Sequence, residues 1–400
     1  MANISTKAQQ MPASAIRKLV PFADAAKKEG VKVYHLNLGQ PDIKSPECAL
    51  AAIKNYSAAN ISYSHSGGLM ELRKGLVDKY YRKIGIDINV DELIVTVAGS
   101  ESVNLALEIA CDPGDEVLVL EPFYTNYNTF AFMNKLTLKA IATDIRNGFQ
   151  IPPIEEFEKA ITPKTKAILI CNPGNPTGTQ YSKESMLALG EIARKHDLFL
   201  LSDEVYREFC YTDEPHFSAM NIPGLEQNVI LIDSVSKRYN LCGARIGCIV
   251  SHNKDVMAAA MKFAQARLCA PVLGQMAAIG ALDTPDYYFD AVKEEYIRRR
   301  DYMIERLNQM EGVFTPLPMG AFYTIAELPV DDTEKFAKWM LENFRIDNET
   351  TMVTPAASFY KTPGMGKNHA RIAYVLEVEE LKKALHILEE GLKAYPGRTL

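Results

Sequence analysis

Two apolar runs flank the segment Ser234-Val235-Ser236-Lys237-Arg238-Tyr239-Asn240-Leu241-Cys242-Gly243-Ala244-Arg245-Ile246-Gly247. These runs, at 229–232 and 246–250, predict buried strands. A lysine at the end of a buried strand loses hydration, which lowers the pKa of its amine. Two serine hydroxyls and the planar fork of an arginine are the donors that a phosphate monoester needs. The segment therefore fits a carbonyl cofactor bound covalently to Lys237 and held by its phosphate. A solvated Lys-Arg patch on a loop is the other interpretation.

The size and composition of the chain indicate a globular protein with more than one domain. Its 400 residues exceed one ordinary hydrophobic core, so two domains are expected. Apolar residues make up 47% and charged residues 24% of the chain, as in ordinary globular proteins. The net charge of −6 argues against nucleic acid or an anionic membrane surface as a partner.

The seven cysteines are scattered, form no C-x-x-C pair and are accompanied by no cluster of histidines. This pattern gives no reason to expect a metal site, and several of the cysteines lie in apolar runs as small hydrophobic residues. Because no signal peptide is evident, we expect a reducing, cytoplasmic location. No apolar run approaches the ~18 residues that cross a bilayer, so no membrane segment is expected.

The order of strands and helices predicts an α/β protein. Apolar strands at 93–97, 117–120, 167–171, 198–201, 229–232 and 246–250 have helical patterns between several of them. This alternation predicts a large domain with a mostly parallel sheet covered by helices. After about residue 286 a charged helix, short strands and amphipathic helices predict a smaller α+β domain formed by both chain ends. The expected division is 1–47 packing with the small domain, 48–288 as the large domain and 289–400 as the small one.

The residues with chemical potential follow the expected strands at their carboxyl ends, where ligands of parallel sheets bind. They are Gly99, Ser100 and Glu101 at a strand–helix junction, Tyr124, Asn175, Asp203 with Tyr206, and Lys237. Several have an ordinary explanation: many strand–helix junctions use small residues, Asn172-Pro173-Gly174-Asn175-Pro176 makes a tight loop, and a buried Asp203 can pair with any nearby arginine or lysine.

Together these residues match the requirements of pyridoxal phosphate. This cofactor needs a lysine for its aldehyde, an acid for its ring nitrogen, donors for its ring hydroxyl, a phosphate cup and an aromatic face. The residues that would supply these in turn are Lys237, Asp203, Asn175 with Tyr206, Ser100 with Ser234, Ser236 and Arg245, and Tyr124. The joint occurrence is far less expected by chance than any one of them.

The pattern S-x-S-K-x-Y-x-x-x-G-x-R-x-G, preceded by N-P-x-N-P-T-G and D-E-x-Y, resembles the class I/II aminotransferases of fold type I, in particular the aspartate-aminotransferase-like subgroups. The resemblance runs from about residue 37 to 371. It implies that Arg371 grips the substrate α-carboxylate together with the backbone N–H of Gly39 and with Asn175. It also implies a homodimer with shared active sites, in which Tyr63 reaches the cofactor phosphate of the neighbouring subunit, and cis peptide bonds before Pro122 and Pro176.

The function implied is transamination between an L-amino acid, aspartate or a related one, and a 2-oxo acid such as 2-oxoglutarate. The second arginine that reads a distal carboxylate in the best-known aspartate-specific subgroup is replaced here by Ala270, so Arg17 and Arg267 are the alternatives. An aromatic, alanine or broad-range aminotransferase, or a lyase of the same fold, remains open. A transcription regulator built on this fold is not expected, because the motifs begin before residue 40.

Overall fold

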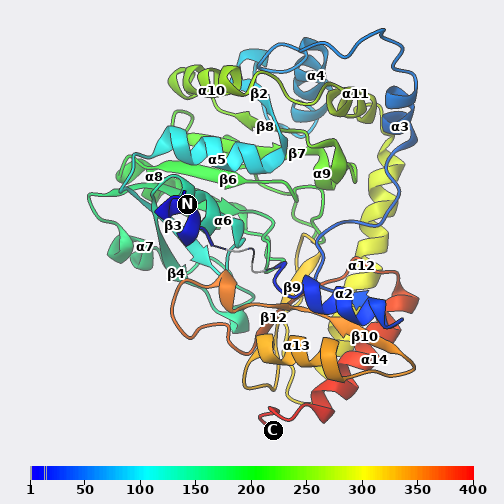
Figure 1. Ribbon diagram of the computed structural model, residues 1–400. Coiled ribbons are helices and arrows are strands. Elements are labelled where there is room, and N and C mark those ends of the chain that lie inside the picture. Colours follow the sequence, from blue (N-terminus) through cyan, green and yellow to red (C-terminus); the bar gives the residue numbers. More distant parts are fainter. Residues whose placement is uncertain (1, 13, 15) are drawn as a thin grey trace.

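The computed structural model describes residues 2–12, 14 and 16–400, which fold into a large and a small part (Figure 1). The large part is built on a seven-stranded sheet of order β2-β8-β7-β6-β5-β3-β4. Its strands are β2 Leu93–Thr96, β3 Glu116–Glu121, β4 Thr137–Ala142, β5 Thr165–Cys171, β6 Phe199–Asp203, β7 Val229–Ser234 and β8 Gly247–Val250. The predicted α/β class and the mostly parallel sheet are confirmed.

Strand β8 is the exception to the parallel pattern, since it pairs antiparallel with both β2 and β7. A parallel return from β7 needs a crossover that packs on one face of the sheet. The segment 235–246 instead holds only the one-turn helix α9 (Val235–Arg238) and the 3-10 helix η5 (Cys242–Ala244). The chain therefore folds straight back, and this places the lysine segment at the carboxyl end of β7.

Both faces of the sheet are buried. Leu200 and Leu231 pack on one face, while their neighbours Leu201 and Ile230 pack on the other, as the alternation of side chains along a strand requires. The first face is covered by α4 (Met70–Gly75), α7 (Ile154–Ala160), α8 (Lys183–Lys195) and α11 (Val272–Ala281), and α3 (Glu47–Lys54) packs on α11. The second face is covered by α5 (Ala98–Ala110), α6 (Asn126–Met133) and α10 (Lys254–Arg267).

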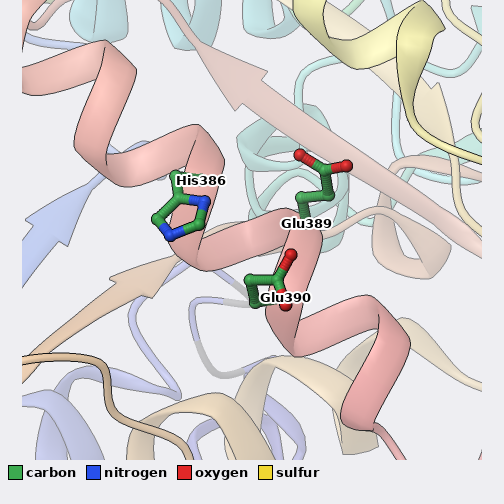
Figure 2. A group of neighbouring side chains, drawn as sticks. All are labelled: His386, Glu389 and Glu390. Carbon is green, nitrogen blue, oxygen red and sulfur yellow. The ribbon is translucent and has the colours of Figure 1, made fainter.

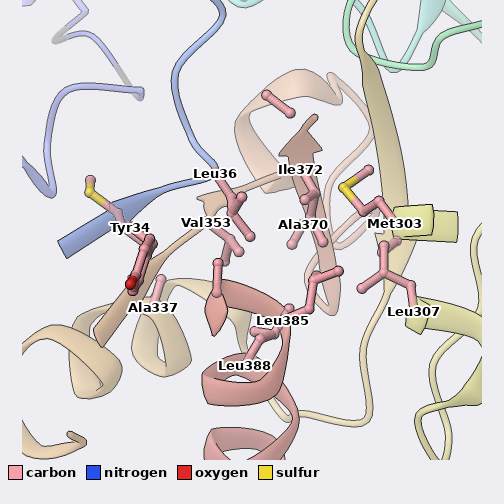
Figure 3. Packing of buried hydrophobic residues seen from close by; sticks show 14 of the residues in the cluster. Tyr34, Leu36, Met303, Leu307, Ala337, Val353, Ala370, Ile372, Leu385 and Leu388 are labelled. Carbon is pink, nitrogen blue, oxygen red and sulfur yellow. The ribbon is translucent and has the colours of Figure 1, made fainter. Parts of the chain in front are cut away.

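The small part joins both ends of the chain, as predicted. Strand β1 (Lys32–His35) pairs in parallel with β10 (Glu349–Met352). A second small sheet has the order β11 (Thr354–Pro355), β12 (His369–Ala373) and β9 (Tyr323–Glu327). The helices around these sheets are α2 (Val20–Lys28), α12 (Asp286–Gln309), α13 (Thr333–Asn343) and α14 (Val378–Ala394). Figure 3 shows the shared core, in which Tyr34 and Leu36 from the N-terminal part lie among side chains of the C-terminal part.

The apolar spacing of residues 69, 72, 76 and 80 predicts one regular helix from residue 69 to about 83, and the observed segment differs from it. After α4 the chain continues as a π-helix, η1 (Leu76–Tyr81), with an extra residue in its turn. The remaining short helices are 3-10 turns: η2 (Val90–Glu92), η3 (Ile145–Asn147), η4 (Ala219–Asn221) and η6 (Ala357–Phe359).

The N-terminal segment contacts both parts. Helix α1 (Thr6–Gln10) lies by the large part, where Lys7 Nζ donates to the carbonyl of Met133 at 2.8 Å. The proposed boundary at 288/289 falls inside α12, the long helix that extends between the two parts (Figure 1). The boundaries at 47/48 and 288/289 therefore stay predictions.

Three further features bear on the expectations. The peptide bonds before Pro122 and Pro176 are cis, as predicted, and so is the one before Pro173. None of the seven cysteines, all of which lie in the described part of the chain, forms a disulfide. Within residues 2–12, 14 and 16–400 no helix combines the length and the apolar character needed to cross a membrane.

Candidate active site

Lys237 lies on the single turn of α9, at the carboxyl end of β7. Its Nζ donates to the carbonyl oxygen of Gly39 at 2.7 Å and lies 3.7 Å from Cys242 Sγ. Burial lowers the pKa of this amine, and the positive charges of Arg371 and Arg245 lower it further, against a raising effect of Cys242. The side chain is thus an amine biased toward its neutral form, as the sequence predicts.

Asp203 ends the neighbouring strand β6 and is buried without a cationic partner among the described residues. Its Oδ2 accepts from the hydroxyl of Tyr127 at 2.8 Å, and its Oδ1 accepts from the N–H of Val205 at 3.4 Å. Burial raises the pKa of the Asp203 carboxyl to about 6. A buried carboxylate with one hydroxyl donor is costly for the fold alone, and a protonated ring nitrogen would supply the missing cation.

Asn175, Tyr206 and Tyr323 form a chain of polar groups beside this pair. Asn175 Nδ2 donates to the Tyr206 hydroxyl at 3.4 Å, and the hydroxyls of Tyr206 and Tyr323 lie 3.0 Å apart. Burial raises the pKa of Tyr206 well above its ordinary value, so the phenol is neutral and can donate. The amide and the phenol fit the donors expected for a ring hydroxyl.

Arg371 is the largest fully buried side chain of the chain's described part. It comes from β12 in the small part, and its NH1 and NH2 donate to Asn175 Oδ1 at 3.1 Å and to the carbonyl of Asn37 at 2.7 Å. Its Nε is buried and has no partner within the described residues. The guanidinium lies 4.7 Å from the ring centre of Tyr323. An unmatched donor on a buried arginine is what a carboxylate ligand would satisfy.

The start of helix α5 meets the lysine segment. Gly247 has no room for a side chain, because a Cβ there would lie 2.6 Å from the carbonyl carbon of Ala98 and 2.8 Å from the nitrogen of Gly99. This contact brings the free N–H groups of the helix start close to Ser234, whose Oγ lies 2.8 Å from Ser236 Oγ. Backbone donors, two hydroxyls and a helix dipole are groups that could bind a phosphate.

The other residues that the sequence singles out lie as follows. Ser100 is exposed on the first turn of α5, and Arg245 is exposed with its NH1 donating to the carbonyl of Cys242 at 2.9 Å. Burial raises the pKa of the half-buried Tyr124, whose hydroxyl accepts from Asn126 Nδ2 at 2.8 Å. Tyr63 is 80% exposed on the segment between α3 and α4. Gly39 is a tight position, because a Cβ would clash with the Tyr323 hydroxyl.

Glu101 and Arg267 are bound to each other. Arg267 Nε donates to Glu101 Oε1 at 2.9 Å, and its NH2 donates to the carbonyl of Val95 at 3.0 Å. The other oxygen of Glu101 accepts from the N–H of Val97. These contacts engage Glu101 with the backbone at the start of α5, and its predicted contact with a cofactor stays a prediction.

Three residues of the site escape the sequence patterns. Tyr127 donates to Asp203, Tyr323 touches Tyr206 and lies by Arg371, and Cys242 lies by Lys237. The spacing of Tyr124 and Tyr127, three residues apart at a helix start, is the one signal that would have drawn attention to Tyr127. Tyr323 reaches the site through the pairing of β9 with β12, which a single sequence does not reveal.

One group of side chains has the composition of a metal site, namely His386, Glu389 and Glu390 on α14 (Figure 2). Both carboxylates already pair with cations: Glu389 with Arg306 at 2.8 Å and with Lys393 at 3.2 Å, and Glu390 with Lys393 at 2.8 Å. We therefore interpret the group as part of the solvated face of helix α14.

Comparison with known proteins agrees with this geometry. A model of the family described as Aminotransferase class I and II matches residues 31–388. An aspartate aminotransferase of Thermotoga maritima is 30% identical over 392 residues, which cover 98% of this chain and 100% of that protein. An aspartate aminotransferase from Thermus thermophilus, solved with maleate, superposes with a TM-score of 0.89 at 30% identity, covering 98% of this chain and 100% of that one. An alanine aminotransferase from Pyrococcus furiosus also gives 0.89, at 31% identity and the same coverage. The chain is an aminotransferase and belongs to the family of class I and II aminotransferases.

Proposed function

We propose that the chain uses pyridoxal phosphate, bound covalently to Lys237, to exchange an amino group between an L-amino acid and a 2-oxo acid. The observation that carries the proposal is the uncompensated Asp203 carboxyl, buried beside the end of the strand that leads into the Lys237 segment. An acid without a cation costs the fold stability, and a cofactor with a protonated ring nitrogen would offset that cost.

Different residues would bind the different parts of the cofactor. Pyridoxal phosphate supplies an aldehyde that captures amines and a ring that accepts the electrons of a breaking Cα–H bond. Asp203 would keep the ring nitrogen protonated, Asn175 and Tyr206 would donate to the ring hydroxyl, and Tyr124 would cover a ring face. The phosphate would be held by Ser100, Ser234, Ser236, Arg245 and the N–H of Gly99.

Lys237 would carry the proton. Burial lowers the pKa of its amine, which favours the neutral form that acts as a base. With the cofactor bound, this amine would be the base that takes the proton from the substrate Cα and the acid that returns it. Its contact with the Gly39 carbonyl keeps it next to the backbone that would bind the substrate carboxylate.

Arg371 would bind the α-carboxylate with the N–H of Gly39 and with Asn175. We expect Arg371→Lys to raise the amino-acid concentration for half-saturation about 10- to 100-fold, because a point charge replaces a two-armed donor. Steady-state kinetics with a saturating oxo acid measure this. Arg345→Lys, an arginine paired with Glu29, is the control and is expected to behave like the unmodified chain. Equal half-saturation in the two variants would contradict the role of Arg371.

We propose aspartate or a related dicarboxylic amino acid and 2-oxoglutarate as the substrate pair, with aromatic, alanine or broad-range specificity as the alternative. The names of the relatives support both, since they include aspartate and alanine aminotransferases. Of the two arginines considered for the distal carboxylate, Arg267 is engaged by Glu101, whereas Arg17 is exposed and its charge acts on Tyr124, as does that of Arg371. Arg17 is therefore the better candidate.

Arg17→Ala should raise half-saturation by aspartate about 10-fold and leave that by alanine within about 2-fold, because only the first substrate carries a distal carboxylate. Arg17→Lys keeps the charge and should recover part of the loss. Half-saturation for both amino acids is measured with the same oxo acid. An equal effect on the two substrates would exclude Arg17 as the residue that reads the side chain.

A homodimer with shared active sites is also proposed, with Tyr63 reaching the partner's cofactor phosphate. Two large hydrophobic side chains of the segment that carries it are exposed, Ile61 at 61% and Tyr63 at 80%. Sedimentation analysis gives the oligomeric state, and Tyr63→Phe should weaken retention of the cofactor. A monomer that retains full activity would overturn this part. The reducing, cytoplasmic location stays a prediction.

The experiment that tests the function as a whole is half-transamination against a panel of amino acids. The cofactor-loaded chain is mixed with one amino acid and no oxo acid, and the absorption spectrum is followed. A transaminase converts the bound cofactor to its amine form and releases a 2-oxo acid in one equivalent per site. A lyase would instead release ammonia or a volatile product over many turnovers without an oxo acid.

A further inference from the structure

A group of charged side chains and two tyrosines, buried except for the half-buried Glu208, lies behind the lysine, and the proposed chemistry makes no use of it. We call it the Asp233 cluster; its members are Tyr80, Tyr81, Glu204, Arg207, Glu208, Asp233 and Arg238. Three of them directly adjoin site residues in the sequence: Glu204 follows Asp203, Asp233 precedes Ser234, and Arg238 follows Lys237. The cluster thus connects to β6 and β7, two of the strands that end in the site.

Asp233 is the centre of the cluster. Its carboxylate accepts from Arg238 NH2 at 2.6 and 2.8 Å, from the Tyr81 hydroxyl at 2.7 Å and from the N–H of Ser234 at 2.7 Å. Arg207 NH1 adds a longer contact at 3.4 Å. Burial acts to raise the pKa of Asp233, but the guanidinium groups of Arg238 and Arg207 prevail and lower it to about 2. The carboxylate is therefore ionised at all physiological pH values.

Arg238 is held on three sides. Besides Asp233, its Nε donates to Glu208 Oε1 at 2.7 Å, and its guanidinium carbon lies 3.5 Å from the ring centre of Tyr80. The side chain is 2% exposed. An arginine whose NH2 contacts both oxygens of one acid, whose Nε contacts a second acid and whose guanidinium lies over an aromatic ring has little freedom to move.

The two tyrosines reach the cluster from consecutive positions of the π-helix η1. Consecutive residues of an α-helix point about 100° apart, so they do not normally serve one site. In η1, Tyr80 contacts Arg207 and Glu208, and the next residue, Tyr81, contacts Asp233. A π-turn stabilises a helix less than a regular turn does, and its retention often marks a functional position.

The element that needs anchoring is α9, which carries Lys237 and has a single turn. A helix of four residues is not stable without outside contacts. Its start is capped by Ser234 Oγ, which accepts from the N–H of Ser236 at 3.1 Å. Its end is held through Arg238. Lys237 lies between these two anchors, next to the second.

We propose that the Asp233–Arg238 ion pair, supported by Tyr81, is the positioning device that holds Lys237 at the cofactor aldehyde. The inference rests on the proposed function of Lys237 and adds residues that touch neither substrate nor cofactor. The competing explanation is that the pair only stabilises the fold. That explanation predicts that variants of the pair have a lower melting temperature but an unchanged pH dependence of Lys237 labelling.

The test compares Asp233→Asn and Tyr81→Phe with the matched control Tyr395→Phe, whose hydroxyl also donates to an aspartate, Asp331, at 3.0 Å. Three quantities are measured on the full chain: the melting temperature, the kcat and half-saturation of the loaded enzyme, and the pH midpoint for acetic anhydride labelling of Lys237 in the cofactor-free chain. Mass spectrometry of the peptide containing Lys237 gives the labelling.

Asp233→Asn should lower kcat at least 10-fold and change half-saturation by less than about 3-fold, because substrate binding is separate from proton transfer. Its labelling midpoint should shift upward, since a loosened lysine regains the water whose loss lowers its pKa. Tyr81→Phe should also lower kcat and raise the labelling midpoint, but by less than Asp233→Asn does. Tyr395→Phe should change the melting temperature alone.

Two results would overturn the proposal. The first is a wild-type kcat and labelling midpoint in Asp233→Asn. The second, if that variant does not fold, is wild-type values in both Tyr81→Phe and Arg238→Lys, which keeps the charge but loses the fork that reaches Asp233 and Glu208 at once. The labelling needs no cofactor, so it remains informative if the half-transamination panel fails.

Discussion

Lys237→Ala should abolish turnover. The lysine has two roles, covalent attachment of the cofactor and movement of the substrate proton, and proton transfer by a positioned base alone contributes about 10²- to 10⁴-fold. We therefore expect single-turnover rates with a saturating amino acid to fall by at least ~10⁴-fold. The intact mass after borohydride reduction should increase by one reduced cofactor in the wild-type chain and stay unchanged in the variant.

The fold should survive this substitution. The amine is buried with its pKa lowered, and it makes one short hydrogen bond, to the Gly39 carbonyl. Removing a poorly solvated amine leaves few groups unsatisfied, so the melting temperature of the cofactor-free chain should stay within a few degrees of wild type. Lys262→Ala, at an exposed position of α10, is the matched control and should retain full activity. Turnover above about one-hundredth of wild type in Lys237→Ala would refute the scheme.

The parts of the site that the sequence predicts are those with an unusual residue type at the end of an apolar strand. Lys237, Asp203 and Asn175 follow strands that were recognisable as apolar runs, and the parallel order brings those ends together. The role of Arg371 could be predicted only from the family resemblance, since nothing near it in the sequence indicates that it enters a site of the large part. The structure brings it to Asn175 across the two parts.

What the sequence does not reveal depends on pairing between distant elements. Tyr323 meets Tyr206 because β9 and β12 form one sheet, and this register is set by tertiary packing. Strand β10, Glu349–Met352, is missed because its residues are mostly polar and yet buried. The π-helix is missed because the apolar spacing from Leu69 to Tyr80 matches a regular helix. The hydrogen bonds that accompany it, from Tyr80 to Glu208 and from Tyr81 to Asp233, are invisible in the local pattern.

Asp203→Asn should separate the function of the site from the stability of the fold. The amide has the same shape and can still accept the Tyr127 hydrogen bond, but it carries no charge to keep a ring nitrogen protonated. We expect turnover to fall by about 10³-fold or more, because an unprotonated ring is a poor electron acceptor. Cofactor content, measured by absorbance after gel filtration, should fall as well.

The same substitution should stabilise the cofactor-free chain. The carboxyl pKa is raised to about 6 in the fold from its ordinary value of 3.8, so the folded state binds a proton more tightly than the unfolded state does. This acid therefore contributes its full stability below about pH 4, and that contribution is lost as the pH rises to about 6. Above that range the ionised acid costs the cofactor-free fold about 3 kcal/mol, and the amide removes this cost.

Urea unfolding of the cofactor-free chains at pH 4 and pH 8 measures the difference. The gain in unfolding free energy of Asp203→Asn over wild type should be small at pH 4 and largest at pH 8. Asp331→Asn, an exposed acid paired with Lys335, is the control and should not gain stability at pH 8. Bound cofactor should reverse the order, because its ring nitrogen pairs with the carboxylate and not with the amide. An acid that lowers the stability of the cofactor-free fold, and stabilises it only when the cofactor is bound, behaves as a functional residue. Equal stability of the two cofactor-free chains at pH 8 would mean that Asp203 has another cation partner. The main physical reason for proposing a cofactor with a protonated ring nitrogen would then be gone.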